Sequence, residues 1–203
     1  MAYTFKGQDI VAPFRLTSNE PVFSADSVSL RVRRVKQGAQ RWEMGFKVVM
    51  ADATSTFADS VSTFHEALTL EMPQLNVRGE VVSSGTSTAT ITTSSGVELP
   101  GDDTIAIGGL LTGTTINAGR FIKFDNHNKI YMITETVTGD GSDFLKIYPS
   151  LRTGVTSGTQ VMYRDGTDAI TFRAYRDVTD TQGITYIDGI LSDLGTINLI
   201  EAL

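Results

Sequence analysis

In "RFIKFDNHNKIYMIT", residues 120–134, two apolar runs flank a group of turn-forming residues. The flanking runs are rich in aromatic and β-branched residues, which favour strands. Asp125, Asn126 and Asn128 favour a turn between them. The stretch therefore predicts two strands joined at residues 125–129, and it places His127 in a turn rather than in an active site.

The same pattern continues from about residue 97 to residue 164, where short apolar runs alternate with turn-forming segments such as "TGDGSD" and "TSGT". Short strands at this spacing predict a small β-barrel or sandwich. Residues 83–96, "SSGTSTATITTSSG", mark a shift in composition towards this second unit. They fit either a linker or a strand within "TATIT" that is short or lies at an edge and is flanked by turns.

The apolar residues of the N-terminal part follow two different spacings. In "VSLRVRRV" (28–35) and "WEMGFKVVM" (42–50) apolar residues alternate with others, which predicts two strands. Since "KQGAQ" lies between them, we expect these two strands to form a β-hairpin. Phe57, Val61, Phe64 and Leu68 follow a four-three-four spacing instead, which predicts a helix at about 56–70 that Pro73 ends.

The chain ends in the apolar runs "AITFRAY", "ITYIDGIL" and "TINLIEAL". An apolar terminus needs a surface to pack on, so we expect it to return to the N-terminal sheet. The predicted fold is mainly β: an antiparallel β-barrel or sandwich with one amphipathic helix, formed by residues 1–95 and 165–203. An inserted small β-barrel domain would occupy residues 96–164.

Composition narrows the class of protein. The 203 residues carry a formal net charge of -6, which argues against a protein that wraps nucleic acid. There is no cysteine, which excludes disulfides and thiolate chemistry. The start lacks a secretory signal, and no apolar run could span a bilayer. We expect a soluble product, retained in the cell and not inserted in a membrane.

No motif organises a catalytic centre. His65 and His127 are far apart and give no zinc spacing, and we expect neither a metal nor a cofactor. His65, beside Phe64 on the predicted helix, is expected to be a partly buried structural residue. Acidic pairs do occur near glycines, in stretches too short for calcium loops. These pairs are Asp102 with Asp103, Asp140 with Asp143, and Asp165 with Asp168.

The most uneven charge feature is a basic cluster on or beside the predicted hairpin. It consists of Arg31, Arg33, Arg34, Lys36 and Arg41. The cluster fits a solvated sheet face with edge-protecting charges, or a contact surface for an acidic partner subunit. Nucleic acid is a third option, without an aromatic row to support it. Leu199 and Ile200 in the apolar terminus are further candidates for a subunit interface.

Two long segments carry a resemblance. "INAGRFIKFDNHNKIYMIT" followed by "FLKIYPSLRTGVTSGTQVMYRD" resembles small β-domains of bacteriophage tail and baseplate proteins. "SADSVSLRVRRVKQGAQRWEM", with Trp42 starting its second strand, looks like the opening hairpin of the phage tail-tube fold. The likeness of the small β-domain rests on Gly119, Phe121, Phe124, Lys129, Tyr131, Pro149, Leu151 and Val161.

The resemblance implies a structural role without catalysis. Proteins of this family form rings, usually hexamers, around the tail lumen through which genomic DNA passes. They connect the tail tube to the hub or spike and hold sheath-initiating or wedge subunits. A tube initiator, a connector ("ripcord") or a distal tail protein is implied. The expected location is the virion tail or baseplate, assembled in the host cytoplasm.

Two other functions stay open. A carbohydrate-binding β-module would need an exposed aromatic platform, and Trp42 is expected to point inward. The candidates for such a platform are Tyr131, Tyr148, Tyr163, Tyr175 and Tyr186. A tail-associated cell-wall hydrolase would need a pair of carboxylates whose separation the sequence does not reveal.

Overall fold

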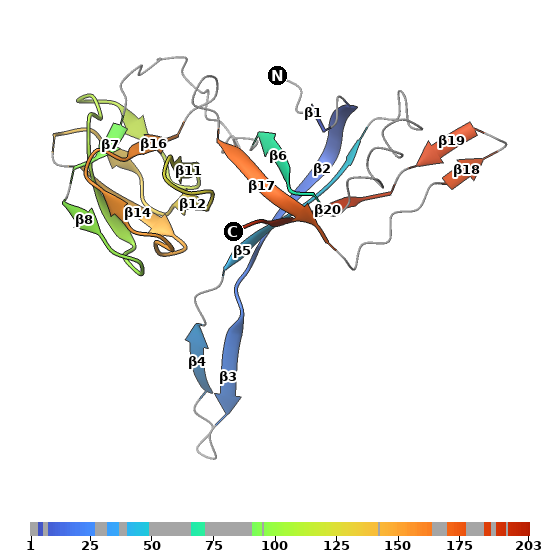
Figure 1. The fold of residues 1–203 in the computed structure, drawn as a ribbon, viewed down its shortest axis with the longest axis horizontal. Helices are drawn as coiled ribbons and strands as arrows, with labels where there is room; N and C mark the ends of the chain where they lie inside the picture. The colour runs from blue at the N-terminus through green and yellow to red at the C-terminus, as the bar shows by residue number, and fades with distance from the viewer. Residues whose placement is uncertain are drawn as a thin grey trace. The chain divides into compact units, whose positions relative to one another are not determined.

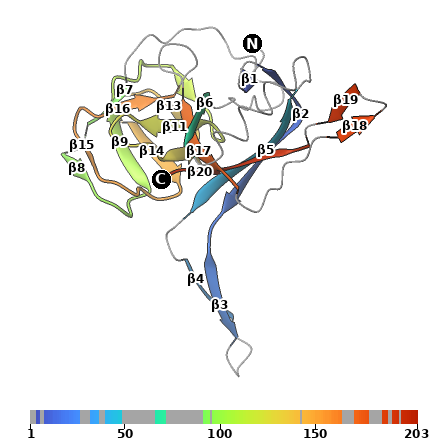
Figure 2. The ribbon, with the colours of Figure 1, turned by 45° about the vertical axis from the view of Figure 1, so that its right-hand side comes forward.

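The structure of the protein is a computed structural model (Figures 1 and 2). It describes residues 4–5, 8–26, 32–36, 40–48, 66–71, 91–94, 96–141, 143–163, 170–177, 185–187, 190–193 and 195–203. This described part is mainly β and contains no helix. The chain divides into two compact units, Met1–Leu70 with Arg173–Leu203, and Glu71–Phe172. The expected domain boundaries, 95/96 and 164/165, lie inside the second unit.

The first unit is built on a six-stranded sheet that both ends of the chain share. Its strand order is β1 (Thr4–Phe5), β2 (Gln8–Asn19), β5 (Arg41–Val48), β20 (Ile197–Glu201), β17 (Thr171–Arg176) and β6 (Leu68–Glu71). β20 lies between β5 and β17 and pairs antiparallel with both. The C-terminal strand therefore joins the N-terminal sheet, as Figure 1 shows in red between blue and orange ribbons.

Period-two burial explains why β5 is a strand. Alternate side chains of β5 are buried, beginning with Trp42 at 4% exposure, while Arg41 and Lys47 are exposed. On the buried face the ring centroids of Phe5 and Phe46 lie 5.3 Å apart in an edge-to-face arrangement. Each such buried aromatic side chain contributes about 1.5–3 kcal/mol of burial free energy. The inward orientation expected for Trp42 is confirmed.

The predicted hairpin is wrong in its pairing. β4 (Val32–Lys36) pairs with β3 (Val22–Asp26), and β5 pairs with β2 from Asn19↔Arg41 to Ile10↔Val48. Residues 28–31 and 49–50 of the predicted strands lie outside the described residues. Alternation shows which side of a strand is buried but does not choose its partner, because every strand offers the same backbone groups.

The end of the predicted helix is also wrong. Leu68, Thr69 and Leu70 belong to β6, where the two leucines are buried and the threonine is exposed. The four-three-four spacing ended on a residue that a strand buries equally well, which is the usual ambiguity of short apolar patterns. Residues 56–65, including Phe57, Val61, Phe64 and His65, lie outside the described residues.

The second unit contains a closed antiparallel barrel, which confirms the predicted small β-barrel. Its strand order is β11 (Phe121–Phe124), β12 (Ile130–Ile133), β14 (Asp143–Tyr148), β9 (Thr104–Gly108), β7 (Ile91–Thr93) and β16 (Gln160–Met162). β7 contains the end of "TATIT" and pairs with both β9 and β16. The strand interpretation of this stretch is therefore correct, but β7 is not an edge strand.

The described residues also form three further short two-stranded pairs. Two of these pairs accompany the barrel, and the third is a ribbon in the first unit. β8 (Val97–Glu98) pairs with β15 (Val155–Thr156), and β10 (Thr115–Ile116) pairs with β13 (Val137–Thr138). β18 (Thr185–Ile187) pairs with β19 (Ile190–Asp193). The barrel interior is filled with aliphatic and aromatic side chains at or near 0% exposure. They include Ile105, Ile122, Phe124, Tyr131, Ile133, Leu145 and Val155.

Gly139 provides a test of the packing beside the barrel. A Cβ at Gly139 would lie 2.4 Å from the backbone oxygen of Leu111, which cannot move aside as a flexible side chain could. We predict that Gly139→Ala lowers the free energy of unfolding by about 2–3 kcal/mol, the usual cost of forcing atoms into a packed region. Urea denaturation followed by far-UV circular dichroism measures this change.

Gly96 is the matched control, because nothing lies within 4 Å of a Cβ built there. Gly96→Ala is expected to change the free energy of unfolding by less than about 0.5 kcal/mol. Equal effects of the two substitutions would contradict the close approach at Gly139.

Candidate functional site

The turn between β11 and β12 holds His127, as predicted, and the histidine takes part in a network of contacts. Its Nε2 lies 2.8 Å from the Tyr131 hydroxyl, and its Nδ1 lies 2.6 Å from Asn126 Oδ1. The imidazole also stacks on Phe124, with ring centroids 5.7 Å apart. Both ring nitrogens are therefore engaged, which is the environment of a structural histidine.

The Tyr131 hydroxyl connects this turn to the segment after β14. It accepts a hydrogen bond from the Arg152 backbone N–H at 3.2 Å. Asn126 Nδ2 donates to the Gly154 carbonyl oxygen at 3.0 Å, a second link to the same segment. Tyr131 itself is fully buried, so it cannot serve as an exposed aromatic platform.

The electrostatics of the turn keep His127 neutral at neutral pH. The pKa of His127 is lowered to about 4, chiefly by burial and also by the neighbouring charges of Lys123 and Lys129, while Asp125 acts in the opposite direction. Burial also lowers the pKa of Lys123, whose Nζ donates to Thr171 Oγ1 at 3.1 Å. A histidine with this pKa is a poor general base near pH 7.

In the acidic pairs that the structure describes, aspartate oxygens accept hydrogen bonds from backbone N–H groups of the turns. Asp102 Oδ2 accepts from the Leu99 N–H at 2.7 Å, and Asp143 Oδ1 accepts from the Asp140 N–H at 3.0 Å. Asp165 and Asp168 lie outside the described residues. In the described part of the chain, no group of three or more histidine, aspartate or glutamate side chains is placed to hold a metal ion.

The outer face of the barrel carries a row of side chains on β14, which we call the β14 row: Phe144, Lys146 and Tyr148. Asp143, Leu145 and Ile147 alternate with these residues and are buried. Phe144 is 58% exposed, which is unusual for a phenylalanine in a regular strand. The sequence "DFLKIY" does not reveal this row, because each of its two alternating sets holds both charged and apolar residues.

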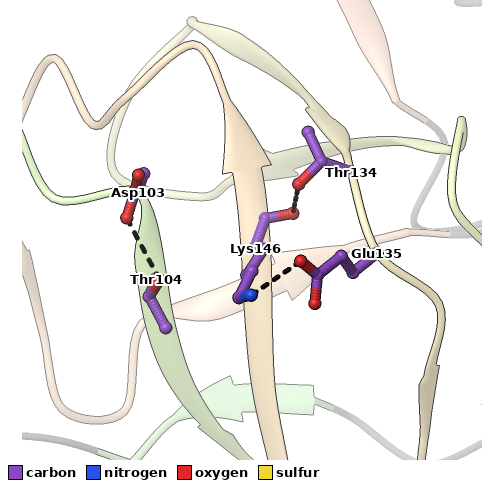
Figure 3. Close-up of polar contacts among 5 residues, drawn as sticks. All are labelled: Asp103, Thr104, Thr134, Glu135 and Lys146. Atoms are coloured by element: carbon purple, nitrogen blue, oxygen red, sulfur yellow. Dashed lines mark hydrogen bonds and ion pairs between the residues drawn. The ribbon is translucent and has the colours of Figure 1, made fainter.

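Polar groups flank the β14 row on both sides (Figure 3). Lys146 Nζ forms an ion pair with Glu135 Oε1 at 2.6 Å, and Thr134 Oγ1 donates to the Lys146 carbonyl oxygen at 3.2 Å. On the other neighbouring strand, Thr104 is the register partner of Lys146 and donates to Asp103 Oδ1 at 3.1 Å. The row thus combines an exposed aromatic ring with carboxylate, ammonium and hydroxyl groups.

The sheet of the first unit has an outward face, here called the sheet face, formed by the solvent-side residues of β2, β5, β20 and β17. A hollow of about 180 Å³ lies in it, lined by Arg15, Glu43, Asn198 and Asp177, among others. Gly45 creates the space, because a Cβ there would lie 2.9 Å from Asn198 Oδ1. Only the register of three strands brings these residues together.

The predicted interface residues differ in position. Arg41 is exposed at the start of β5, and Ile200 is half-buried on the sheet face. Leu199 is 1% exposed and packs within the chain's own sheet. Arg33, Arg34 and Lys36 belong to β4, for which the structure describes the backbone alone, and Arg31 lies outside the described residues.

The tyrosines considered for a carbohydrate-binding platform differ in their exposure and position. Tyr163 is buried at 6% exposure, whereas Tyr175 is 46% exposed on the sheet face. Tyr148 is half-buried in the β14 row, and Tyr186 belongs to β18.

The chain matches no protein-family model, and no curated protein is significantly similar to it in sequence. Within the described residues, no helix is long and apolar enough to cross a membrane.

Removing the imidazole should change how stability depends on pH. The pKa of His127 in the folded protein, about 4, is below its ordinary value of 6.5. The unfolded state therefore binds more protons between these values, and stability falls as pH drops from 6.5 to 4. Because the ring is partly exposed, solvent screening leaves about 1 kcal/mol for this contribution.

We predict that His127→Gln removes the fall in stability that His127 contributes between pH 6.5 and pH 4. The pH dependence that comes from the other titratable groups should remain. Unfolding free energies of both proteins, measured in urea from pH 7 to pH 4, provide the comparison. Parallel curves for the two proteins across this range would contradict the contact network around His127.

Proposed function

We propose that the chain is a structural subunit of a bacteriophage tail baseplate, which forms a ring with copies of itself around the tail lumen. The observation that carries this proposal is the number of open β edges. β1 and β6 are the edges of the six-stranded sheet, and among the described residues the β3–β4 and β18–β19 ribbons pair only with themselves. Open edges and isolated two-stranded ribbons are marginal in water and favour association.

The remaining parts of the proposal follow from the family resemblance. In such a ring the subunit connects the tail tube to hub or spike proteins and holds sheath or wedge subunits, and DNA passes through the lumen without being read. Arg33, Arg34 and Lys36 give β4 a basic composition suited to an acidic neighbour. The role proposed for all these contacts is assembly rather than catalysis.

Removing the β3–β4 ribbon tests the proposal. Asn19 and Arg41 are register partners, so residues 20–40 can be replaced by Asn-Gly, which forms a two-residue hairpin turn. We predict that the shortened chain keeps its sheet but no longer binds the other tail proteins, because it has lost the basic strand β4. Reconstitution with the other tail proteins, followed by analytical ultracentrifugation, measures this loss.

The matched control keeps the ribbon and Arg31, and it replaces residues 27–30 with a glycine-serine segment of equal length. It should assemble as the wild-type chain does. Normal assembly of the shortened chain would contradict a role for the ribbon, and a wild-type chain that stays monomeric beside its tail partners would overturn the proposed function.

A second candidate function is carbohydrate binding through the β14 row. The specific observation in its favour is Phe144, an exposed ring with Lys146, Glu135 and Asp103 within the same surface region. An aromatic face packs on the C–H groups of a sugar ring, and the flanking charged and hydroxyl groups can bond its hydroxyls. The two carboxylates disfavour nucleic acid at this face.

We predict that Phe144→Ser reduces glycan binding at least tenfold, the effect of losing about 1.4 kcal/mol of contact free energy. A glycan array followed by titration of any glycan that binds gives the measurement. Leu99→Ser is the control, because Leu99 is 61% exposed in the same unit but lies outside the β14 row. Absence of saturable binding by the wild-type chain would exclude this second function.

A further inference from the structure

The sheet face differs in charge from the chain as a whole. Among its described side chains, the exposed cations are Arg15, Arg41, Lys47 and Arg173, and the carboxylates are Glu43 and Asp177. The full chain, by contrast, has a net charge of -6. A surface that concentrates cations in an acidic protein suits an acidic partner, because complementary potentials favour encounter and docking.

The centre of the sheet face also has the features of a docking surface. Tyr175, 46% exposed, is the register partner of Ile200, which lines the hollow over Gly45. Tyrosine and arginine are the residues that most often dominate binding at protein interfaces. An exposed tyrosine one strand from the hollow, on a face that also carries Arg15, Arg41 and Arg173, is thus suited to receive a protruding apolar segment.

The β18–β19 ribbon has the matching composition. Its sequence from 185 to 193, "TYIDGILSD", holds two aspartates and no basic residue. Two of its three register pairs, Tyr186 with Leu191 and Ile187 with Ile190, consist of apolar or aromatic residues, and the third joins Thr185 with Asp193. Within the described part of the chain, neither strand pairs with any strand outside the ribbon. A two-stranded ribbon of this composition needs a surface to cover it.

We propose that the β18–β19 ribbon of one copy docks on the sheet face of the next copy, over the hollow at Gly45. The inference rests on the proposed assembly of copies and identifies the contact that holds them together. The β3–β4 ribbon is the poorer occupant, because Arg33, Arg34 and Lys36 have the same sign as the arginines of the sheet face.

The proposed contact has a geometric consequence. Ribbon and sheet face are different surfaces of one chain, so the contact is heterologous and repeats from head to tail. Such a contact closes into a ring or continues as a filament. A copy with a defective sheet face still offers its ribbon, and a copy with a defective ribbon still offers its sheet face.

This consequence gives the experiment. The face variant carries Arg15→Glu and Arg173→Glu, and the ribbon variant carries Leu191→Thr and Asp193→Lys. We expect each variant alone to be monomeric, with its self-association weakened about 30-fold or more, as for loss of interface hot spots. An equimolar mixture should form a one-to-one dimer and nothing larger, since one productive contact remains. Analytical ultracentrifugation of the full-length chains measures the species.

The controls separate the possible outcomes. Arg152→Glu reverses an exposed charge in the other unit and should leave assembly unchanged. Near-UV circular dichroism checks that every variant is folded. Variants that assemble like the wild type would overturn the contact but leave the proposed assembly function intact. A mixture that stays monomeric, with both variants folded, would also overturn the contact.

Two remaining results have distinct meanings. If the wild-type chain is monomeric, both the contact and the proposed function fail. If hydrogen exchange protects the ribbon equally in monomers and assemblies, the ribbon covers a surface of its own chain, and docking between copies is wrong.

Discussion

The pairing of β20 with two partners is the constraint on which the first unit depends. β5 and β20 are separated by about 150 residues of chain, yet they exchange backbone hydrogen bonds along Ile197↔Phe46 to Ile200↔Glu43. Beyond the last of these pairs, Glu201 Oε2 accepts from the Trp42 N–H at 3.1 Å. Strand pairs this distant in sequence cost much conformational entropy to close, and the buried apolar face of the sheet offsets that cost.

That closure also explains how the barrel can occupy the middle of the chain. The ladder of β5, β20 and β17 holds the segments on both sides of the barrel in register. The barrel has its own closed ring of strands and its own apolar interior, so its stability does not require a sheet edge from the first unit. Its outer face is then available for other contacts, as at Phe144.

The proposed functions use these two units differently. The barrel is closed, so the surface it offers consists of side chains such as those of the β14 row. The first unit is open, and it offers β edges, ribbons and a sheet face with a hollow. Assembly through the open unit and recognition through the closed one are compatible, because they involve separate residues of the same chain.

Local signals in the sequence were sufficient for several elements of the barrel and for the burial pattern of β5. Turn residues at 125–129 placed His127 between two strands, and the spacing of turns from 97 to 164 predicted a small barrel. These signals are local, since a turn depends on the backbone preferences of a few neighbouring residues. The alternation of β5 likewise indicated the inward position of Trp42 before any partner strand was known.

The strand pairing and the candidate sites depend on contacts between distant parts of the chain. Pro13, for example, lies where the β2–β5 register shifts between Val11 and Arg15, and the register beyond it brings Arg15 opposite Gly45. The hollow needs that register together with Asn198 from the far end of the chain. Hydrophobic periodicity sets the direction of a side chain along one strand. It contains nothing about which distant strand will supply the neighbour, because backbone hydrogen bonding is the same for every sequence.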